Sequence, residues 1–387
     1  MNYLQRAREL KTELVNNRRQ IHENPELGLD LPNTVTYVMD KLKEMGYEPK
    51  QIGGGVTAIA GESGKTILLR ADMDALPMEE QSGLDFSSKN GAAHTCGHDM
   101  HAAMLLGAAK LLKENEANLK GRVKFMFQPA EEIFAGAKAM INEGIMEEPR
   151  PDCAMSSHVF SGHSYDKVFV KEGPLLSGCN GFKITIHGKG CHGAQPQNGI
   201  DPINIGVHIH LALQELISRE VDFNNSALLT FGQFVSGTAA NIIPETAILQ
   251  GTLRTFNEEI REYLVERMKT IVKLTAEKFR GTADVEILSD LPVLMNDSDL
   301  TKSVRSYLQD MSGSEITVEP GFMATASEDF SFIAKMVPSV TVFFGASDMD
   351  VESYPMHHPK VQFDERVLYR GAAMYAEVAD RWLKENS

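Results

Sequence analysis

The chain has 387 residues, of which 42% are apolar and 24% charged, and its formal net charge is −15. This length predicts two domains or one large α/β domain with an insertion, and the acidic balance excludes a nucleic-acid surface, which would need a basic stripe. We find no run of about 18 apolar residues and no signal segment, and the four cysteines are sparse, so we expect a cytoplasmic protein with reduced thiols and no membrane span.

Hydrophobic periodicity divides the first part of the chain into alternating helices and strands. In chain order we predict helices at residues 2–22 and 33–45, strands at 56–60 and 65–70, a helix at 102–113, a strand at 122–127, a helix at 135–143 and a strand at 153–157. Asn33 is a candidate cap for the second helix, and Gly46 ends it. Such alternation predicts an α/β fold with a largely parallel sheet.

The middle of the chain has a different order of elements. We predict a strand at 182–188, a helix at 202–218 capped by Asp201, strands at 227–235 and 246–256, a helix at 258–279 and a strand at 283–288. The order β-α-β-β-α-β is typical of a ferredoxin-like α+β domain. We therefore expect residues 179–290 to be inserted into a discontinuous main domain of residues 1–178 and 291–387. That domain resumes with a helix at 296–308, a strand at 339–344 and a helix at 365–384.

Polar side chains follow three predicted strands of the main domain, and they are Asp72, Asp74, Glu131, Glu132 and His158. Ligands of parallel α/β sheets bind beyond the carboxyl ends of the strands. These side chains are therefore predicted to belong to one functional site.

Residues 94–101 are the densest stretch of candidate metal ligands, because they hold three of the twelve histidines and one of the four cysteines. Cys96 and His98 are two positions apart around Gly97, which lets the backbone turn. A thiolate and an imidazole so placed suit a transition metal, although the same spacing also arises from composition alone.

Each acidic candidate has a structural interpretation beside the functional one. Glu131 and Glu132 either begin a solvated helix, or one of them binds a metal while the other is the base for a metal-bound water. Asp72 and Asp74 lie on the same side of an extended chain. They either belong to a turn or support a metal-binding imidazole.

The other polar candidates are isolated residues. His158 is either a hydrogen-bonded core histidine or a ligand, and His357 and His358 are either loop residues or ligands. Three polar groups of the inserted domain are either turn and surface residues or functional groups: His192, Asn241 and Arg254.

Six motifs occur in a characteristic order, at residues 70–77, 94–101, 128–132, 188–196, 240–244 and 251–256. Together they resemble the M20 family of metallopeptidases, in the amidohydrolase branch. That branch includes hippurate hydrolases, N-acyl-L-amino-acid amidohydrolases, plant auxin-conjugate hydrolases and N-acetyldiaminopimelate deacetylases. The resemblance covers nearly the whole chain.

The resemblance implies a catalytic domain with two divalent metal ions per subunit (Zn, Mn, Ni or Co) and an inserted lid or dimerisation domain, hence a homodimer or a higher homo-oligomer. By position it implies the metal ligands Cys96, His98, Glu132, His158 and His357. It implies Glu131 as general base, with Asp72 or Asp74 as the supporting acid. It also implies substrate or oxyanion contacts from three residues: His192, which would reach the partner's site, Asn241 and Arg254.

We therefore predict metal-dependent hydrolysis of the amide bond of N-acyl amino acids, with Glu131 as base. A dipeptidase or aminopeptidase using the same dimetal site is the alternative, and a non-catalytic metal- or ligand-binding relative is another. Two positions depart from the family pattern. His358 stands where Ser or Asn is usual, which leaves it as an alternative ligand to His357, and Cys191 stands where Gly or another small residue is common.

Overall fold

The structure is a computed structural model, which describes residues 1–313 and 315–387. The chain forms two compact units. Unit 1 comprises Met1–Leu175, Met295–Phe322 and Glu328–Ser387, and unit 2 comprises Leu176–Leu294 and Met323–Ser327. The segment expected as an insertion, residues 179–290, lies within unit 2, which is longer at both ends.

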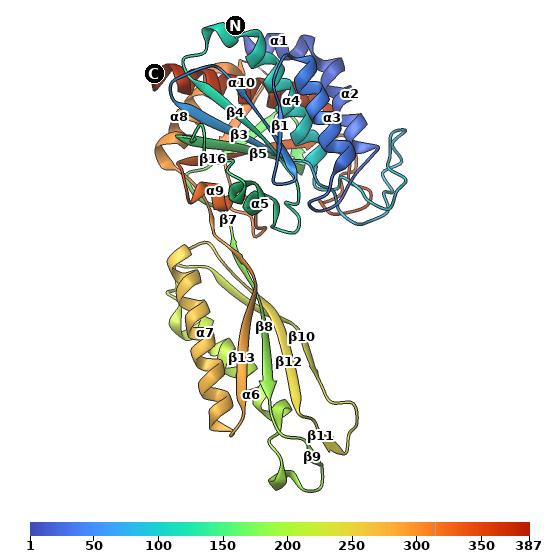
Figure 1. The fold of residues 1–387 in the computed structure, drawn as a ribbon, viewed down its shortest axis with the longest axis vertical. Helices are drawn as coiled ribbons and strands as arrows, with labels where there is room; N and C mark the ends of the chain where they lie inside the picture. Colours follow the sequence, from blue (N-terminus) through green and yellow to red (C-terminus); the bar gives the residue numbers. More distant parts are fainter. Residues whose placement is uncertain (314) are drawn as a thin grey trace. The chain divides into compact units, whose positions relative to one another are not determined.

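Unit 1 is built around a mixed sheet with the strand order β1-β2-β4-β3-β5-β16-β6-β15 (Figure 1). In that order the strands are Lys50–Ile52, Gly55–Ala60, Arg122–Gln128, Thr66–Asp72, Cys153–Ser164, Ser339–Ser347, Lys167–Val170 and Thr317–Pro320. The four central strands β4, β3, β5 and β16 run parallel. The predicted, largely parallel α/β sheet is therefore confirmed, and the carboxyl ends of its central strands meet at one edge.

Helices surround this sheet, and α4 (His98–Glu114) packs against α10 (Leu368–Glu385) in the core. The Ala- and Leu-rich sequence of α4 has almost no polar face, which explains why the helix is buried along most of its length. The other helices of unit 1 are α1 (Tyr3–Glu9), α2 (Lys11–His22), α3 (Pro32–Glu44), α5 (Gly136–Asn142), α8 (Ser298–Ser312) and α9 (Ser331–Ala334). None of the described helices is both long and apolar enough to cross a membrane.

Two N-terminal predictions are wrong in detail. The single helix predicted at residues 2–22 is two helices, because the backbone leaves the helical conformation at Leu10, with φ −86° and ψ 1°. Asn33 does not cap α3, which starts at Pro32. Instead the Glu26 carboxylate accepts hydrogen bonds from Asn33 N (3.1 Å) and Thr34 N (2.8 Å). A carboxylate at this end also complements the helix dipole.

Unit 2 contains a four-stranded antiparallel sheet with the order β10-β12-β8-β13, accompanied by α6 and α7 (Figure 1). Its elements are β8 (Gly178–His187), α6 (Pro202–Glu220), β10 (Ala227–Ser236), β12 (Thr246–Thr255), α7 (Glu258–Lys278) and β13 (Thr282–Leu291). This order confirms the ferredoxin-like prediction. The predicted cap is also present, since Asp201 Oδ1 accepts from Ile203 N at 2.9 Å.

Candidate metal centre

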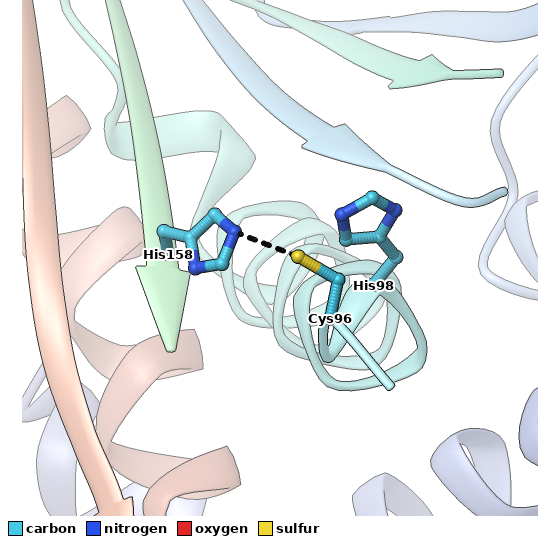
Figure 2. Close-up of side chains that lie close together, drawn as sticks. All are labelled: Cys96, His98 and His158. Atoms are coloured by element: carbon cyan, nitrogen blue, oxygen red, sulfur yellow. Dashed lines mark hydrogen bonds between the residues drawn. The ribbon is translucent and has the colours of Figure 1, made fainter. Parts of the chain in front are cut away.

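Five side chains from four segments of the chain converge at the carboxyl edge of the sheet in unit 1: Cys96, His98, Glu132, His158 and His357. Cys96 Sγ lies 3.5 Å from His158 Nε2 (Figure 2) and 3.3 Å from His357 Nε2. Glu132 Oε1 lies 3.5 Å from His357 Nε2 and 3.8 Å from His98 Nε2. The structure therefore brings together the whole set of ligand candidates.

The donor atoms of this cluster fit a metal ion. His98 Nε2 and Glu132 Oε1 are buried, and neither has a hydrogen-bond partner among the described residues. Buried polar atoms without partners are costly, so two that face each other indicate a missing cationic partner. A thiolate, imidazoles and a carboxylate together suit a borderline divalent ion such as Zn²⁺.

Backbone carbonyl groups orient two of the histidines. His98 Nδ1 donates to Asp74 O at 2.8 Å, and His158 Nδ1 donates to Val159 O at 2.7 Å. Each bond assigns the ring proton to Nδ1, so the lone pair of Nε2 is free to bind a metal. Figure 2 shows the Cys96 sulfur between these two imidazole rings.

Gly97 allows Cys96 and His98 to stand at the start of α4. Its φ is 90°, in the left-handed region, and a Cβ at this position would lie 2.4 Å from Val159 Cγ2. Any other residue would therefore be strained and would clash. The glycine of the motif thus fixes the turn that presents the thiolate and the imidazole.

Asp74 organises the segment that carries the two glutamates. Ala130 has a φ of 53°, which is rare for a residue with a side chain. After this turn, Glu131 N and Glu132 N donate to the Asp74 carboxylate at 3.0 and 3.1 Å. Asp74 Oδ1 also lies 3.4 Å from His98 Nδ1. Asp74 therefore supports both Glu132 and His98.

Asp72 supports a different histidine. Its Oδ1 accepts from His101 Nδ1 at 2.5 Å, and its Oδ2 accepts from Arg70 Nη1 at 2.6 Å. His101 Nε2 in turn accepts from Val159 N at 2.9 Å. Because Val159 follows His158 on β5, this chain of bonds holds the strand that carries one ligand candidate.

Arg70 is buried at the centre of an acidic group. Its guanidinium donates to Gln128 Oε1 (2.9 Å), Glu328 Oε1 (2.8 Å) and Asp329 Oδ1 (3.2 Å). The sequence patterns do not indicate a role for Arg70. The available signal was a single cation within β3, a strand that is buried at every position and whose other residues between Thr66 and Asp72 are apolar.

The two classes of buried acid differ in proton affinity. Burial, together with Glu328 and Asp329, raises the pKa of Glu131 well above its usual value. Burial also acts to raise the pKa of Asp72, but His98 and Arg70 outweigh it and hold that pKa well below its usual value. Glu131 is thus suited to accept a proton, whereas Asp72 stays ionised.

A family model described as peptidase family M20/M25/M40 matches residues 68–381. The chain belongs to this family. It is a hydrolase, as the motifs predicted, and all five ligand candidates lie within the matched residues of this M20 protein.

Named relatives of this M20 chain extend over nearly its whole length. An N-acetyl-L-cysteine deacetylase of Bacillus subtilis is 39% identical, over 97% of this chain and 90% of the relative. A hippurate hydrolase of Campylobacter jejuni is 36% identical, over 99% of this chain and 100% of the relative. The crystal structure of a dinuclear metal-binding M20 peptidase from Bacillus subtilis is 31% identical, with a TM-score of 0.85, over 97% of this chain and 99% of that one.

The candidates of unit 2 lie at two places in the M20 chain. His192 and Asn241 are exposed and adjacent, because β9 (Cys191–His192) pairs with β11 (Ile242–Ile243) and Gly193 N donates to Asn241 O at 2.8 Å. Arg254 lies near the other end of β12, where its Nη1 donates to Ser327 Oγ at 2.8 Å. Unit 2 therefore brings two of its three candidates together.

A buried network behind α4 was not found from the sequence. His22 lies between two acids, with Nδ1 at 2.8 Å from Asp99 Oδ2 and Nε2 at 2.9 Å from Glu80 Oε1. Arg18 also donates to Asp99 Oδ2, at 2.6 Å. Because Asp99 follows His98, this network fixes the first turn of α4. His22 is buried, although it lies on a helix that the sequence predicts only as amphipathic.

Proposed function

We propose that this M20 hydrolase cleaves the amide bond of N-acyl amino acids at a site that holds two divalent metal ions. The observation that carries the proposal is the convergence of five donor side chains beside Glu131, a carboxylate that is not needed as a ligand. Two relatives are named for N-acetyl-L-cysteine and for hippurate, which are both acyl amino acids, and this supports the substrate class.

The metal ligands proposed are Cys96, His98, Glu132, His158 and His357. When bound, divalent ions at such a site polarise an amide carbonyl and lower the pKa of water. A neighbouring M20 structure described as dinuclear supports the number of ions. The thiolate of Cys96 favours Zn²⁺ or Ni²⁺ over harder ions, and Mn²⁺ and Co²⁺ are the other candidates.

Glu131 is the proposed general base. Its Oε2 lies 4.0 Å from His98 Nε2, so the carboxylate borders the cluster. Its raised pKa gives the carboxylate the proton affinity that a base needs near neutral pH. Glu131 takes the proton of the attacking water and then passes it to the leaving nitrogen. Asp74 is the proposed supporting acid for Glu131, and Asp72 supports the His158 strand.

Unit 2 is the proposed lid and dimerisation domain. His192 and Asn241 are exposed, which a residue that reaches a partner's site must be. Arg254 is proposed to bind the substrate carboxylate. Within the described residues, β10 is an edge strand of its sheet. Next to it, α6 exposes Val207 and Leu211. An unpaired strand beside an apolar helix face supports a homodimer.

The location proposed is the cytoplasm. All four cysteines are unpaired in the structure. Free thiols are typical of proteins in a reducing compartment.

A substrate panel with controlled metal content tests the proposed reaction. The chelated protein is reloaded with Zn²⁺, Mn²⁺, Co²⁺ or Ni²⁺, and hydrolysis of hippurate, N-acetyl amino acids and Gly-Gly dipeptides is measured. We expect metal-dependent release of amino acid from the acyl substrates at rates well above those for dipeptides. Faster dipeptide cleavage would favour the peptidase alternative, and no hydrolysis of any substrate would indicate a non-catalytic relative.

A further inference from the structure

Strand β5 continues beyond His158, and an aromatic side chain follows on the same face. Side chains alternate along a strand, so residue 160 faces the same way as residue 158. The Phe160 ring lies 5.3 Å from the His158 ring, centre to centre. The next strand adds Phe343, which pairs with His158 in register and lies 4.7 Å from Phe160.

These rings belong to a larger surface, which we call the aromatic row, formed by Phe160, His163, Phe169, Phe322 and Phe343. Phe322 lies near its centre, with ring centres 5.6 Å from Phe160, 5.4 Å from Phe343 and 5.4 Å from Phe169. His163 stacks on Phe322 at 5.4 Å. The row therefore extends across β5, β16 and β6 from a ligand candidate of the metal centre.

The aromatic row has a buried base and a partly open surface. Phe343 and Phe169 are buried, whereas Phe160, His163 and Phe322 are half-buried. Burial and the nearby Lys167 lower the pKa of His163, so its ring is uncharged at neutral pH. Neither metal binding nor proton transfer by Glu131 uses these rings.

We propose that the aromatic row receives the acyl group of the substrate, with Phe160 and Phe322 as the residues that select aromatic acyl groups. The inference rests on the proposed amide hydrolysis, because it places the reacting carbonyl at the metal centre. A benzoyl ring is bonded directly to its carbonyl carbon. In such a substrate the ring must therefore lie next to the metal ligands when the carbonyl is at the metal centre. Phe160 is at that distance from His158, and aromatic rings prefer offset or edge-to-face partners 4.5–7 Å away, roughly the spacings within the row.

The test uses matched substrates and matched variants of the metal-loaded protein. Hippurate and N-acetylglycine share the amino acid and differ in the acyl group, whereas N-acetylphenylalanine and N-acetylglycine differ only in the amino acid. The variants are Phe160→Ala, Phe322→Ala and Phe160→Tyr. Phe223→Ala is the control, because Phe223 is 100% exposed and lies in unit 2.

We expect the wild-type protein to prefer hippurate over N-acetylglycine in kcat/KM. Each alanine variant should lower kcat/KM for hippurate by about tenfold, as the loss of one aromatic contact and its buried area implies, and leave N-acetylglycine within about twofold. Phe160→Tyr should retain the preference, and Phe223→Ala should match the wild type. Thermal melting of each variant verifies that it is folded.

Three results would overturn the inference. One is an unchanged ratio of hippurate to N-acetylglycine in both alanine variants, and another is an equal loss for both substrates. The third is a selective loss for N-acetylphenylalanine, which would assign the row to the amino-acid side chain. If the wild-type protein hydrolyses both acylglycines, only this inference is at stake. If it hydrolyses no acyl amino acid, the proposed function fails and the inference fails with it.

Discussion

His357 Nε2 lies 3.3 Å from Cys96 Sγ, although the two residues are 261 positions apart. The next histidine, His358, instead stacks on Tyr354 with ring centres 4.7 Å apart. His357 has a φ of 63°, a strained conformation of the kind found at functional sites. The fold thus directs one of two adjacent histidines towards the cluster.

This arrangement predicts that, of these two adjacent histidines, His357 binds metal and His358 does not. His357→Ala should lose metal and His358→Ala should retain it, since the described contacts of the His358 ring are with Tyr354 and Lys360 N, outside the cluster. Metal content after dialysis against a weak chelator, measured by mass spectrometry, separates the two. Equal metal retention by both variants would contradict the assignment.

Glu131→Gln should abolish turnover and leave the metal bound. General bases typically contribute roughly 10²–10⁴-fold to the rate, and glutamine cannot accept the proton. Glu132→Gln is the matched variant, because it replaces an anionic carboxylate donor of the cluster with a neutral amide and should weaken metal binding. Both quantities, kcat on an acyl amino acid and metal content, are measured on the same samples. Substantial activity in Glu131→Gln would refute the role of base.

Periodicity predicted that Glu132 and His158 follow strands, whereas the full set of ligand candidates, His357 included, was implied by the resemblance to the M20 family. Residues 123–127 are apolar except for Lys124 and predict a strand, so the acids after it are expected at the sheet edge. The motif at residues 94–101 added the thiolate. The sequence did not predict which strands are neighbours in the sheet. The parallel strands β5 and β16, for example, pair Ala154 with Ser339, which are about 185 residues apart. Such non-local pairing leaves no mark in local patterns.

The supporting contacts could not be predicted for a related reason. Whether Asp72 or Asp74 contacts Glu131 depends on where the chain turns after β3, and alternation alone puts both on one side. His22 lies on a helix whose spacing indicates only amphipathicity, so its burial against Asp99 arises from tertiary packing. The short strands β1, β6 and β15 of three or four residues were also missed, because such runs carry too little periodicity.

Arg70→Met should destabilise unit 1 strongly. The substitution leaves Asp72, Glu328 and Asp329 buried without their cation, and removal of one partner from a buried charge network costs about 3–5 kcal/mol. Urea unfolding of the metal-free protein measures the loss. Arg6→Met is the control, since its ion pairs are partly exposed and such pairs are worth about 0–1 kcal/mol. A similar small effect at Arg70 would show that the network does not stabilise the fold.

Leu211→Asp should convert the proposed dimer to a monomer. Ile203, Val207 and Leu211 recur at four-residue spacing on the exposed face of α6, and Leu211 is 57% exposed. A carboxylate there would be desolvated in an interface but is harmless on a free surface. Sedimentation velocity of wild type and variant gives the oligomeric state. Leu274→Asp, on α7, is the control for a single exposed leucine. A wild-type monomer, or a variant that stays dimeric, would rule out this face.

The network around His22 should make stability depend on pH in a defined direction. Burial alone would lower the pKa of His22, but Asp99 and Glu80 outweigh it, so the pKa is raised. A raised folded-state pKa means that the stabilisation is complete below the unfolded value, about 6.5, and is lost as pH rises through the folded value. The partner Glu80 remains ionised throughout this range, because burial is outweighed by His22 and its pKa falls to about 2.

His22→Gln should therefore reduce the free energy of unfolding more at pH 6 than at pH 9.5, because only the protonated imidazole donates to both acids at once. Urea unfolding of wild type and variant at the two pH values measures the difference. His187→Gln removes an exposed histidine that faces Asp284 and should change stability little at either pH. A penalty for His22→Gln that is equal at both pH values would mean that the ring acts only through packing, and that its charge does not hold the first turn of α4.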